Sequence, residues 1–299
     1  MNRKTPMRLR SLSWPLLCRA STPLAASALL LLAACSGKSD ADLLASGKQL
    51  MAGGDLTGAV IQFKSALQKA PDSGELRLLL GKALLEQGDP VSAKVELTKA
   101  LELQVAEEQV LPSLARAMLA LAEDAALVAK FGNTRLKEAE PAADLLTSLA
   151  SAQLMRNDKD GARARIQQAY QAVPGYVPAT VLDAQLQAAA GDFDAALTLL
   201  DQALAKAPTD ERGGILKGEV LWRGKRDAEG ALASFRQVLA AKPKSASAHS
   251  AVIGILTEQK KPEEARAVRS VQEGLAQPPR HAVSRSAIRV LGQGRQDHA

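Results

Sequence analysis

A repeat with a period close to 34 residues is the feature of this chain that most constrains its fold. Small residues, which we call anchors, mark the period at Ala59, Ala93, Ala162, Ala196, Ala231 and Ala265. Leu127 fills the one gap in this series. Because each unit of such a repeat buries its apolar face against its neighbours, we expect an extended stack and not one central core.

Each anchor lies on a predicted amphipathic helix. Large apolar residues follow the anchors by four positions, namely Phe63, Leu97, Phe131, Ile166, Leu200 and Phe235. Seven positions on, the residues are mostly small: Ala66, Ala100, Thr134, Ala169, Ala203 and Val238. This spacing places all three on one helical face. Twelve positions before the anchors stand the small residues Gly47, Gly81, Ala115, Ala150 and Ala184, which let a preceding helix pack closely.

Turn-forming residues separate the two predicted helices of each unit. They are Gly53-Gly54-Asp55, Gly88-Asp89-Pro90, Asn157 to Gly161, and Gly191-Asp192. Proline twelve positions after an anchor, as at Pro71 and Pro174, closes the second helix. Gly218 lies thirteen positions before its anchor, which predicts a one-residue insertion in that turn. The alternative, a non-repetitive helical bundle, requires six coincidences at one period.

The pattern resembles the tetratricopeptide repeat (TPR), with a small residue at position eight, alanine at twenty and twenty-seven, an aromatic at twenty-four and proline near thirty-two. The resemblance implies an all-α, right-handed superhelix (an α-solenoid) of six to seven helical hairpins. The array spans 40–265, with repeats near 40–73, 74–107, 108–142, 143–176, 177–210 and 211–245 and a partial one at 246–269. The third repeat is the most degenerate, because it lacks the anchor alanine and Pro141 arrives late.

Two stretches, 54–67 and 79–85, and the Ala-Ala-Cys-Ser-Gly run at 33–37 resemble the PEP-CTERM-system TPR lipoprotein family (PrsT type). That family accompanies exosortase and exopolysaccharide genes. The resemblance implies a scaffold for protein or peptide partners in the cell envelope, acting in exopolysaccharide production or export, with the polysaccharide-export machinery among its partners. An outer-membrane or pilus assembly TPR lipoprotein is the second hypothesis, and gene neighbourhood separates the two.

The first 34 residues are predicted to be a lipoprotein signal peptide. Basic residues precede a charge-free apolar run, Leu24 to Ala34, which is shorter than the roughly 20 residues of a membrane-spanning helix. The run ends in Leu32-Ala33-Ala34-Cys35, which resembles a lipobox and implies lipidation of Cys35, with 35–39 as an acylated linker. By the same resemblance, Ser36 favours the periplasmic face of the outer membrane. An ordinary signal peptide is the alternative.

The seventh unit breaks the pattern. Arg269 and Gln272 stand four and seven positions after Ala265, and Pro278-Pro279 oppose a helix. We expect a broken seventh unit, which would lack its second helix if the reading frame has slipped, and we expect 270–299 to be a disordered or frameshifted basic tail. Residues 1–34 and 266–299 carry net charges of +5 and +4, so the whole-chain value of +6 leaves −3 for the middle. With the basic excess confined to the ends, nucleic acid is not an expected partner.

No catalytic or metal-binding cluster is predicted. The three histidines, His249, His281 and His298, are scattered, and two of them lie in the predicted tail. The sequence contains no zinc-protease helix motif, phosphate loop or nucleophile elbow. We therefore expect a protein without enzymatic activity, cofactor or metal.

The TPR resemblance implies a ligand groove, lined by positions two, five, nine, twelve and thirteen of the first helix in each hairpin. Position nine is occupied by Lys48, Lys82, Arg116, Ser151, Gln185 and Glu219, and Trp222 and Arg223 hold positions twelve and thirteen of the sixth repeat. The three basic residues form a row that could bind an anionic peptide or polysaccharide through charge-assisted contacts. For the row, solvated surface charge is the favoured interpretation and ligand binding the alternative; for Trp222, stacking on a ligand and helix packing both stay open.

Replacing Cys35 with alanine should abolish lipidation and release the protein from the membrane, because acyl chains contribute about 0.8 kcal/mol per buried methylene. Fractionation of cells that express Cys35→Ala measures this release, with Ser36→Ala as a control that keeps the thiol. Retention of Cys35→Ala in the outer-membrane fraction would contradict the assignment.

Overall fold

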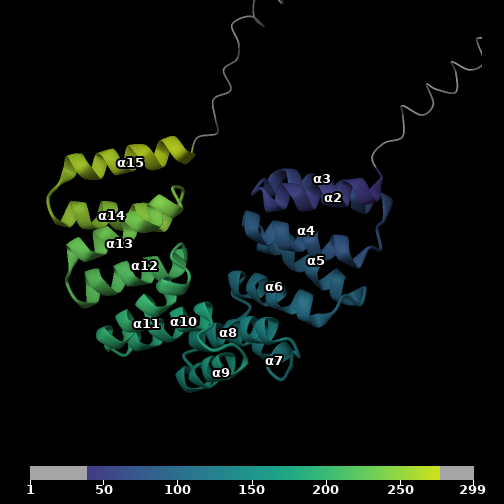
Figure 1. Cartoon of the computed structure of the whole chain (residues 1–299), viewed down its shortest axis with the longest axis horizontal. Coiled ribbons are helices and arrows are strands. Elements are labelled where there is room, and N and C mark those ends of the chain that lie inside the picture. The colour runs from purple at the N-terminus through teal and green to yellow at the C-terminus, as the bar shows by residue number, and fades with distance from the viewer. Residues whose placement is uncertain (1–38, 277–299) are drawn as a thin grey trace, which may run out of the picture.

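The computed structural model describes residues 39–276, and this part of the chain is a series of seven helical hairpins that follow an open arc (Figure 1). The predicted all-α solenoid is confirmed. The helices are α2 (Asp40–Ala52), α3 (Leu56–Lys69), α4 (Gly74–Gln87), α5 (Pro90–Glu102), α6 (Glu107–Ala120), α7 (Asp124–Phe131), α8 (Ala139–Met155), α9 (Lys159–Ala172), α10 (Val177–Ala189), α11 (Phe193–Lys206), α12 (Glu211–Glu219) with the π-helical segment η2 (Val220–Gly224), α13 (Ala228–Ala241), α14 (Ala246–Glu258) and α15 (Pro262–Ala276).

The hairpin turns share one local geometry. A residue with positive φ stands five positions before every anchor, at Gly54, Gly88, Ala122, Asn157, Gly191, Arg226 and Lys260. In five turns the next residue is an aspartate whose carboxylate accepts the backbone N–H three positions on: Asp55, Asp89, Asp158, Asp192 and Asp227. Such a cap satisfies a free donor at the helix start and contributes about 1 kcal/mol. The predicted turns are therefore confirmed.

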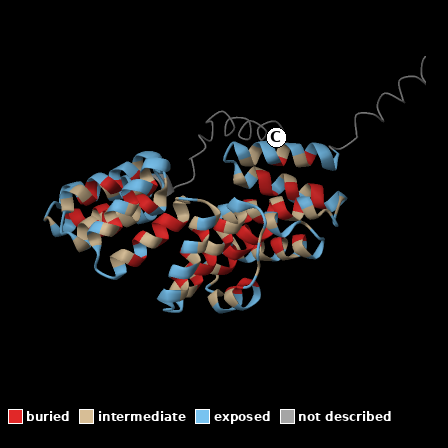
Figure 2. Ribbon diagram, turned by 60° about the horizontal axis from the view of Figure 1, so that its bottom comes forward, coloured by how far each residue is buried: buried red, intermediate tan, exposed pale blue. Residues whose placement is uncertain are grey.

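Close packing inside each hairpin follows from the small residues. The anchors Ala59 to Ala231 are fully buried, and Ala265 is 8% exposed. A Cβ placed on Gly81 would lie 2.6 Å from Leu97 Cγ, and Gly47 and Gly218 face Phe63 and Phe235 in the same way. The buried residues form a band between the helices, while the outer surfaces are exposed (Figure 2).

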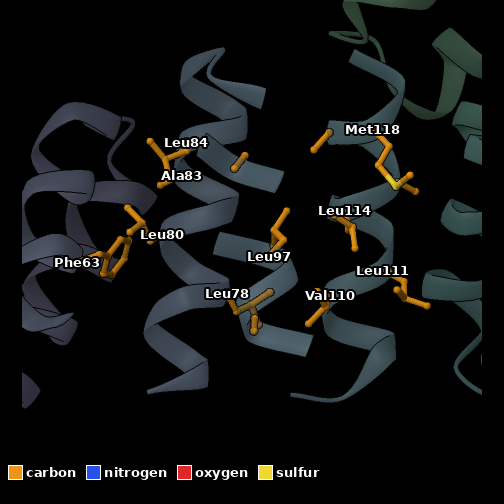
Figure 3. Close-up of a cluster of buried hydrophobic side chains, with 14 of the residues drawn as sticks. Phe63, Leu78, Leu80, Ala83, Leu84, Leu97, Val110, Leu111, Leu114 and Met118 are labelled. Carbon is orange, nitrogen blue, oxygen red and sulfur yellow. The ribbon is translucent and has the colours of Figure 1, made fainter. Parts of the chain in front are cut away.

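The apolar contacts continue from hairpin to hairpin. Figure 3 shows Leu97 of α5 lying between leucines of α4 and leucines of α6. One cluster of buried residues spans the first three hairpins and reaches Leu145 and Leu149 of α8. Truncating a buried leucine or phenylalanine to alanine in such a layer typically costs about 2–5 kcal/mol.

The predicted insertion before Ala231 is not in the turn. Arg226 keeps the positive φ of 57° five positions before the anchor, so the turn itself is unchanged. The extra residue lies inside the helix, where Val220–Gly224 is π-helical and the Lys225 N–H donates to the Val220 carbonyl at 3.0 Å. A π-helical turn takes in one more residue without losing backbone hydrogen bonds, so this site is favoured over the turn.

The seventh hairpin also differs from the prediction. Its second helix is present, because α15 runs from Pro262 to Ala276 and passes the exposed Arg269. Val268, three positions after Ala265, packs on the buried cluster of the last two hairpins in place of the expected apolar residue at position 269. A disordered tail therefore does not begin at residue 270. Residues 277–299 lie outside the described residues, as do the predicted signal peptide and Cys35.

Ala196→Trp should destabilise the fold by roughly 1–3 kcal/mol or more, because the fully buried anchor leaves no room for an indole between two helices. Thermal unfolding followed by circular dichroism measures the change. Ala164→Trp, on the exposed face of α9, is the matched control. Equal melting temperatures for the two variants would show that the assigned repeat register is wrong.

Candidate functional site

The first helices of the hairpins line the inner side of the arc (Figure 1). They contact one another in sequence, α2 with α4, α4 with α6, α6 with α8, α8 with α10 and α10 with α12. The position-nine side chains all reach the surface, with Lys48, Arg116, Gln185 and Glu219 exposed and Lys82 and Ser151 half-buried. These residues are therefore accessible to a ligand.

The three residues of the basic row, Lys48, Lys82 and Arg116, have different electrostatic surroundings. Lys48 is paired with Glu75 at 2.6 Å, and both side chains are exposed. Burial lowers the pKa of Lys82, the neighbouring Arg116 lowers it further, and Glu86 opposes both effects. Arg116 donates to Ser113 Oγ at 3.3 Å and lies 4.0 Å from the Asp144 carboxylate. Each member of the row therefore has an acidic residue close by.

A cavity of about 850 Å³ opens on the inner side beside Lys82 and Arg116. Four successive hairpins contribute to it, through α4, α6, the start of α8 and the residue before α10. Its lining consists of Lys82, Leu85, Glu86, Glu108, Gln109, Pro112, Ser113, Arg116, Glu138, Glu140, Pro141, Asp144 and Tyr176. The structure thus brings Lys82 and Arg116 together, while Lys48, Ser151, Gln185 and Glu219 lie outside this cavity.

Asp144 and Tyr176 are two further titratable groups whose pKa values this site shifts. Burial raises the pKa of Asp144, although Arg116 and Arg212 act to lower it. Burial also raises the pKa of Tyr176 to about 12, with a further contribution from Asp144. The carboxylate therefore sits where water solvates it poorly, and Tyr176 stays protonated at physiological pH.

Trp222 connects the sixth and seventh hairpins. Its indole Nε1 donates to Glu258 Oε2 at 3.0 Å, and its ring packs against the buried cluster of the last two hairpins. A Cβ on Gly254 would lie 3.1 Å from the ring, so this glycine permits the close approach. The Arg223 guanidinium lies 5.2 Å from the ring centroid. Trp222 is accordingly a packing residue in this structure, and only part of its surface is left for a ligand.

The sequence matches a tetratricopeptide repeat family description over 50–117 and 153–219, and a second description of the same repeat over 223–271. The chain belongs to the tetratricopeptide repeat family. TPR proteins are generally non-enzymatic scaffolds that bind protein partners. Between the first two matched ranges, 118–152 is unmatched; it contains the end of the third hairpin, whose sequence departs most from the pattern, and most of α8.

Solved TPR structures share the fold. A TPR protein from Parabacteroides merdae is 18% identical, over 85% of this chain and 98% of that one, with a TM-score of 0.55. A chain of the APC/C hetero-tetramer Cut9-Hcn1 is 16% identical, over 78% of this chain and 46% of that one, with a TM-score of 0.57. The type IV pilus biogenesis factor PilW is 14% identical, over 72% of this chain and 99% of that one, with a TM-score of 0.52. No curated protein matches the sequence.

Sequence reasoning missed most of the acidic lining of the cavity. Asp144 stands at position two of the fourth repeat, and Gln109 and Pro112 at positions two and five of the third. These are TPR groove positions, and Leu85 and Glu86 hold positions twelve and thirteen of the second repeat. The signal was therefore present, but positions twelve and thirteen were considered only in the sixth repeat, and positions two and five in none. Tyr176 closes its repeat and has no such position, so only the folded chain places it here.

Two other site types find no support between residues 39 and 276. That range contains no group of three or more His, Cys, Asp or Glu residues arranged to hold a metal ion. None of its helices is long and apolar enough to cross a membrane.

Asp144→Asn should raise the melting temperature at neutral pH. Burial raises the pKa of Asp144 in the folded chain, so its contribution to stability is fully present below the ordinary aspartate pKa of about 3.9 and is lost as the pH rises through the folded value. The asparagine removes this loss, and its advantage should shrink on acidification. Asp201→Asn, which breaks only the exposed pair with Lys217, should not raise the melting temperature. A lower melting temperature for Asp144→Asn at neutral pH would contradict the assignment.

Proposed function

We propose that this protein is a lipid-anchored TPR scaffold on the periplasmic face of the outer membrane, and that its concave groove binds a segment of a partner protein. The observation that carries the proposal is the cavity beside Lys82 and Arg116, to which four successive hairpins contribute. A hollow of this size accommodates several side chains of a bound segment. Its walls are helices fixed by the packing of the array, so the site is largely formed before binding.

The anchor is proposed from sequence alone. Cys35 ends the apolar run of the signal segment and precedes the first helix by a short linker. Ser39 caps α2, with its hydroxyl accepting the Asp42 N–H at 3.1 Å. Since a residue spans at most about 3.6 Å, an acylated Cys35 would hold the first hairpin close to the membrane surface.

Exopolysaccharide production or export in a PEP-CTERM/exosortase system is the pathway that we propose. The resemblance to that lipoprotein family lies in 54–67 and 79–85, which fall on α3 and α4. Many of these residues are buried in the array, including Phe63, Leu80 and Leu84. Their likeness therefore supports a similar array more strongly than a similar ligand. Deleting the gene should reduce secreted polysaccharide, and normal polysaccharide with lost piliation would favour the alternative.

That alternative is a role in outer-membrane or pilus assembly. PilW, a type IV pilus biogenesis factor, shares the fold with a TM-score of 0.52 and is spanned over 99% of its length. At 14% identity this likeness concerns the fold. The gene deletion described above distinguishes this second function from the first.

A photoreactive amino acid at position 116 should crosslink the partner in intact cells, because Arg116 lines the cavity and is exposed. The matched control carries the same group at Ala129, which is exposed on α7, the second helix of the same hairpin. Mass spectrometry of the adducts identifies the partner. A partner captured at position 129 and not at position 116 would overturn the groove assignment.

A further inference from the structure

The charges around the cavity do not favour the anionic ligand suggested by the basic row. Five carboxylates line it, Glu86, Glu108, Glu138, Glu140 and Asp144, against the two cations Lys82 and Arg116, which gives a net charge of −3. An anionic segment entering the cavity would meet this excess. The balance favours a cationic ligand group.

The five carboxylates are not equivalent. Glu108 and Glu140 lie in the first turns of α6 and α8, and Glu138 directly precedes α8. Acidic residues at helix starts are stabilised by the helix dipole, so these three have a structural reason to be there. Glu86 is exposed and lies near Lys82.

Asp144 has no such reason. It lies beyond the first turn of α8, and its side chain is 23% exposed. Within the described chain its nearest cationic partner is Arg116, at 4.0 Å, which is beyond hydrogen-bonding distance. A carboxylate removed from water without a hydrogen-bond donor is unfavourable, and a donor supplied by a ligand would relieve that cost. The Arg116 side chain is 56% exposed, so it can move aside.

The rest of the lining suits the stem of a long cationic side chain. Leu85, Pro112, Pro141 and the ring of Tyr176 provide apolar surface beside the carboxylates. Arginine and lysine bury an apolar stem while the charged head stays near polar groups. An aromatic face also attracts a cation, which contributes about 0.5–1 kcal/mol at exposed sites.

We propose that the cavity receives an arginine or lysine side chain from a basic segment of the partner protein, with Asp144 as its counter-ion. This inference rests on the proposed groove function and names the chemistry of the ligand at that site. Tyr176 flanks the bound cation, and Glu140 and Glu138 attract neighbouring basic residues.

The cation site can be tested with two synthetic peptides of equal length and the protein from Cys35 onward. The peptides are identical except that one carries two arginines where the other carries two glutamates. Binding is measured by fluorescence anisotropy at low and at high salt. The arginine peptide should bind, and Asp144→Asn should weaken it about tenfold, as expected for losing one hydrogen bond to a charged group. Asp201→Asn, an aspartate outside the cavity, should change the affinity less than about twofold.

Circular dichroism confirms that both variants are folded before binding is compared. If the glutamate peptide binds instead and Arg116→Gln weakens it, the proposed cation site is wrong while the groove function stands. If the arginine peptide binds equally well to wild type and Asp144→Asn, its contact is non-specific surface charge and the inference fails. If neither peptide binds and crosslinking at position 116 also captures nothing, the groove function itself fails.

Discussion

The contact between the two helices of a hairpin is the interaction on which this structure depends. A small residue of the first helix, such as Gly81, meets a large apolar residue of the second, such as Leu97, at a distance that leaves no room for a Cβ. Protein interiors are packed at near-crystalline density, so this contact fixes the distance and crossing of the helices. The glycine contact recurs at Gly47 and Gly218, and alanines hold the equivalent position in the three hairpins between Gly81 and Gly218. Stacking of such hairpins at a near-constant period produces a long curved surface.

The cavity lies beside the hairpin that follows this rule least well. Helix α7 ends at Phe131, so Thr134 falls in the loop before α8. Arg165 of α9 donates to the Gly132 carbonyl at 2.7 Å and secures the end of this short helix. Beside this short second helix, α6 packs on α8 more extensively than the other neighbouring first helices pack on one another, and the start of α8 brings Glu140, Pro141 and Asp144 to the inner surface. Degeneracy in one repeat thus coincides with the chemically most distinctive part of the groove.

Most of the fold could be predicted from the periodicity of the sequence. The anchors and the large residues that follow them mark buried contacts, and the Gly-Asp pairs mark turns, because each depends only on neighbours within one hairpin. Two features of the fold were predicted wrongly. The insertion near Gly218 was assigned to the turn, although a helix can absorb one residue as a π-helical segment. The last helix was ended too early, because Arg269 breaks the apolar stripe. However, Pro262, Glu263 and Glu264 favour a helix start, and Val268 supplies the packing.

The candidate site was less predictable because it is formed between hairpins. Lys82 and Arg116 follow from the repeat register, whereas the approach of Asp144 and Tyr176 depends on how α8 and α10 sit against α6. Two of the three cations in the row, Lys82 and Arg116, therefore line a cavity with an acidic excess, and the third, Lys48, lies outside it. The charge of a ligand can therefore be inferred only when the residues of neighbouring hairpins are considered together with the charge pattern of the repeat.

Hydrogen–deuterium exchange on the protein with its captured partner bound is the most direct test of whether the inner surface around the third and fourth hairpins is the binding site. We expect partner binding to slow exchange in α6 and in the first turns of α8, and to leave exchange in α3, α5 and α7 unchanged. Protection confined to those second helices, with α6 and α8 unaffected, would contradict this assignment.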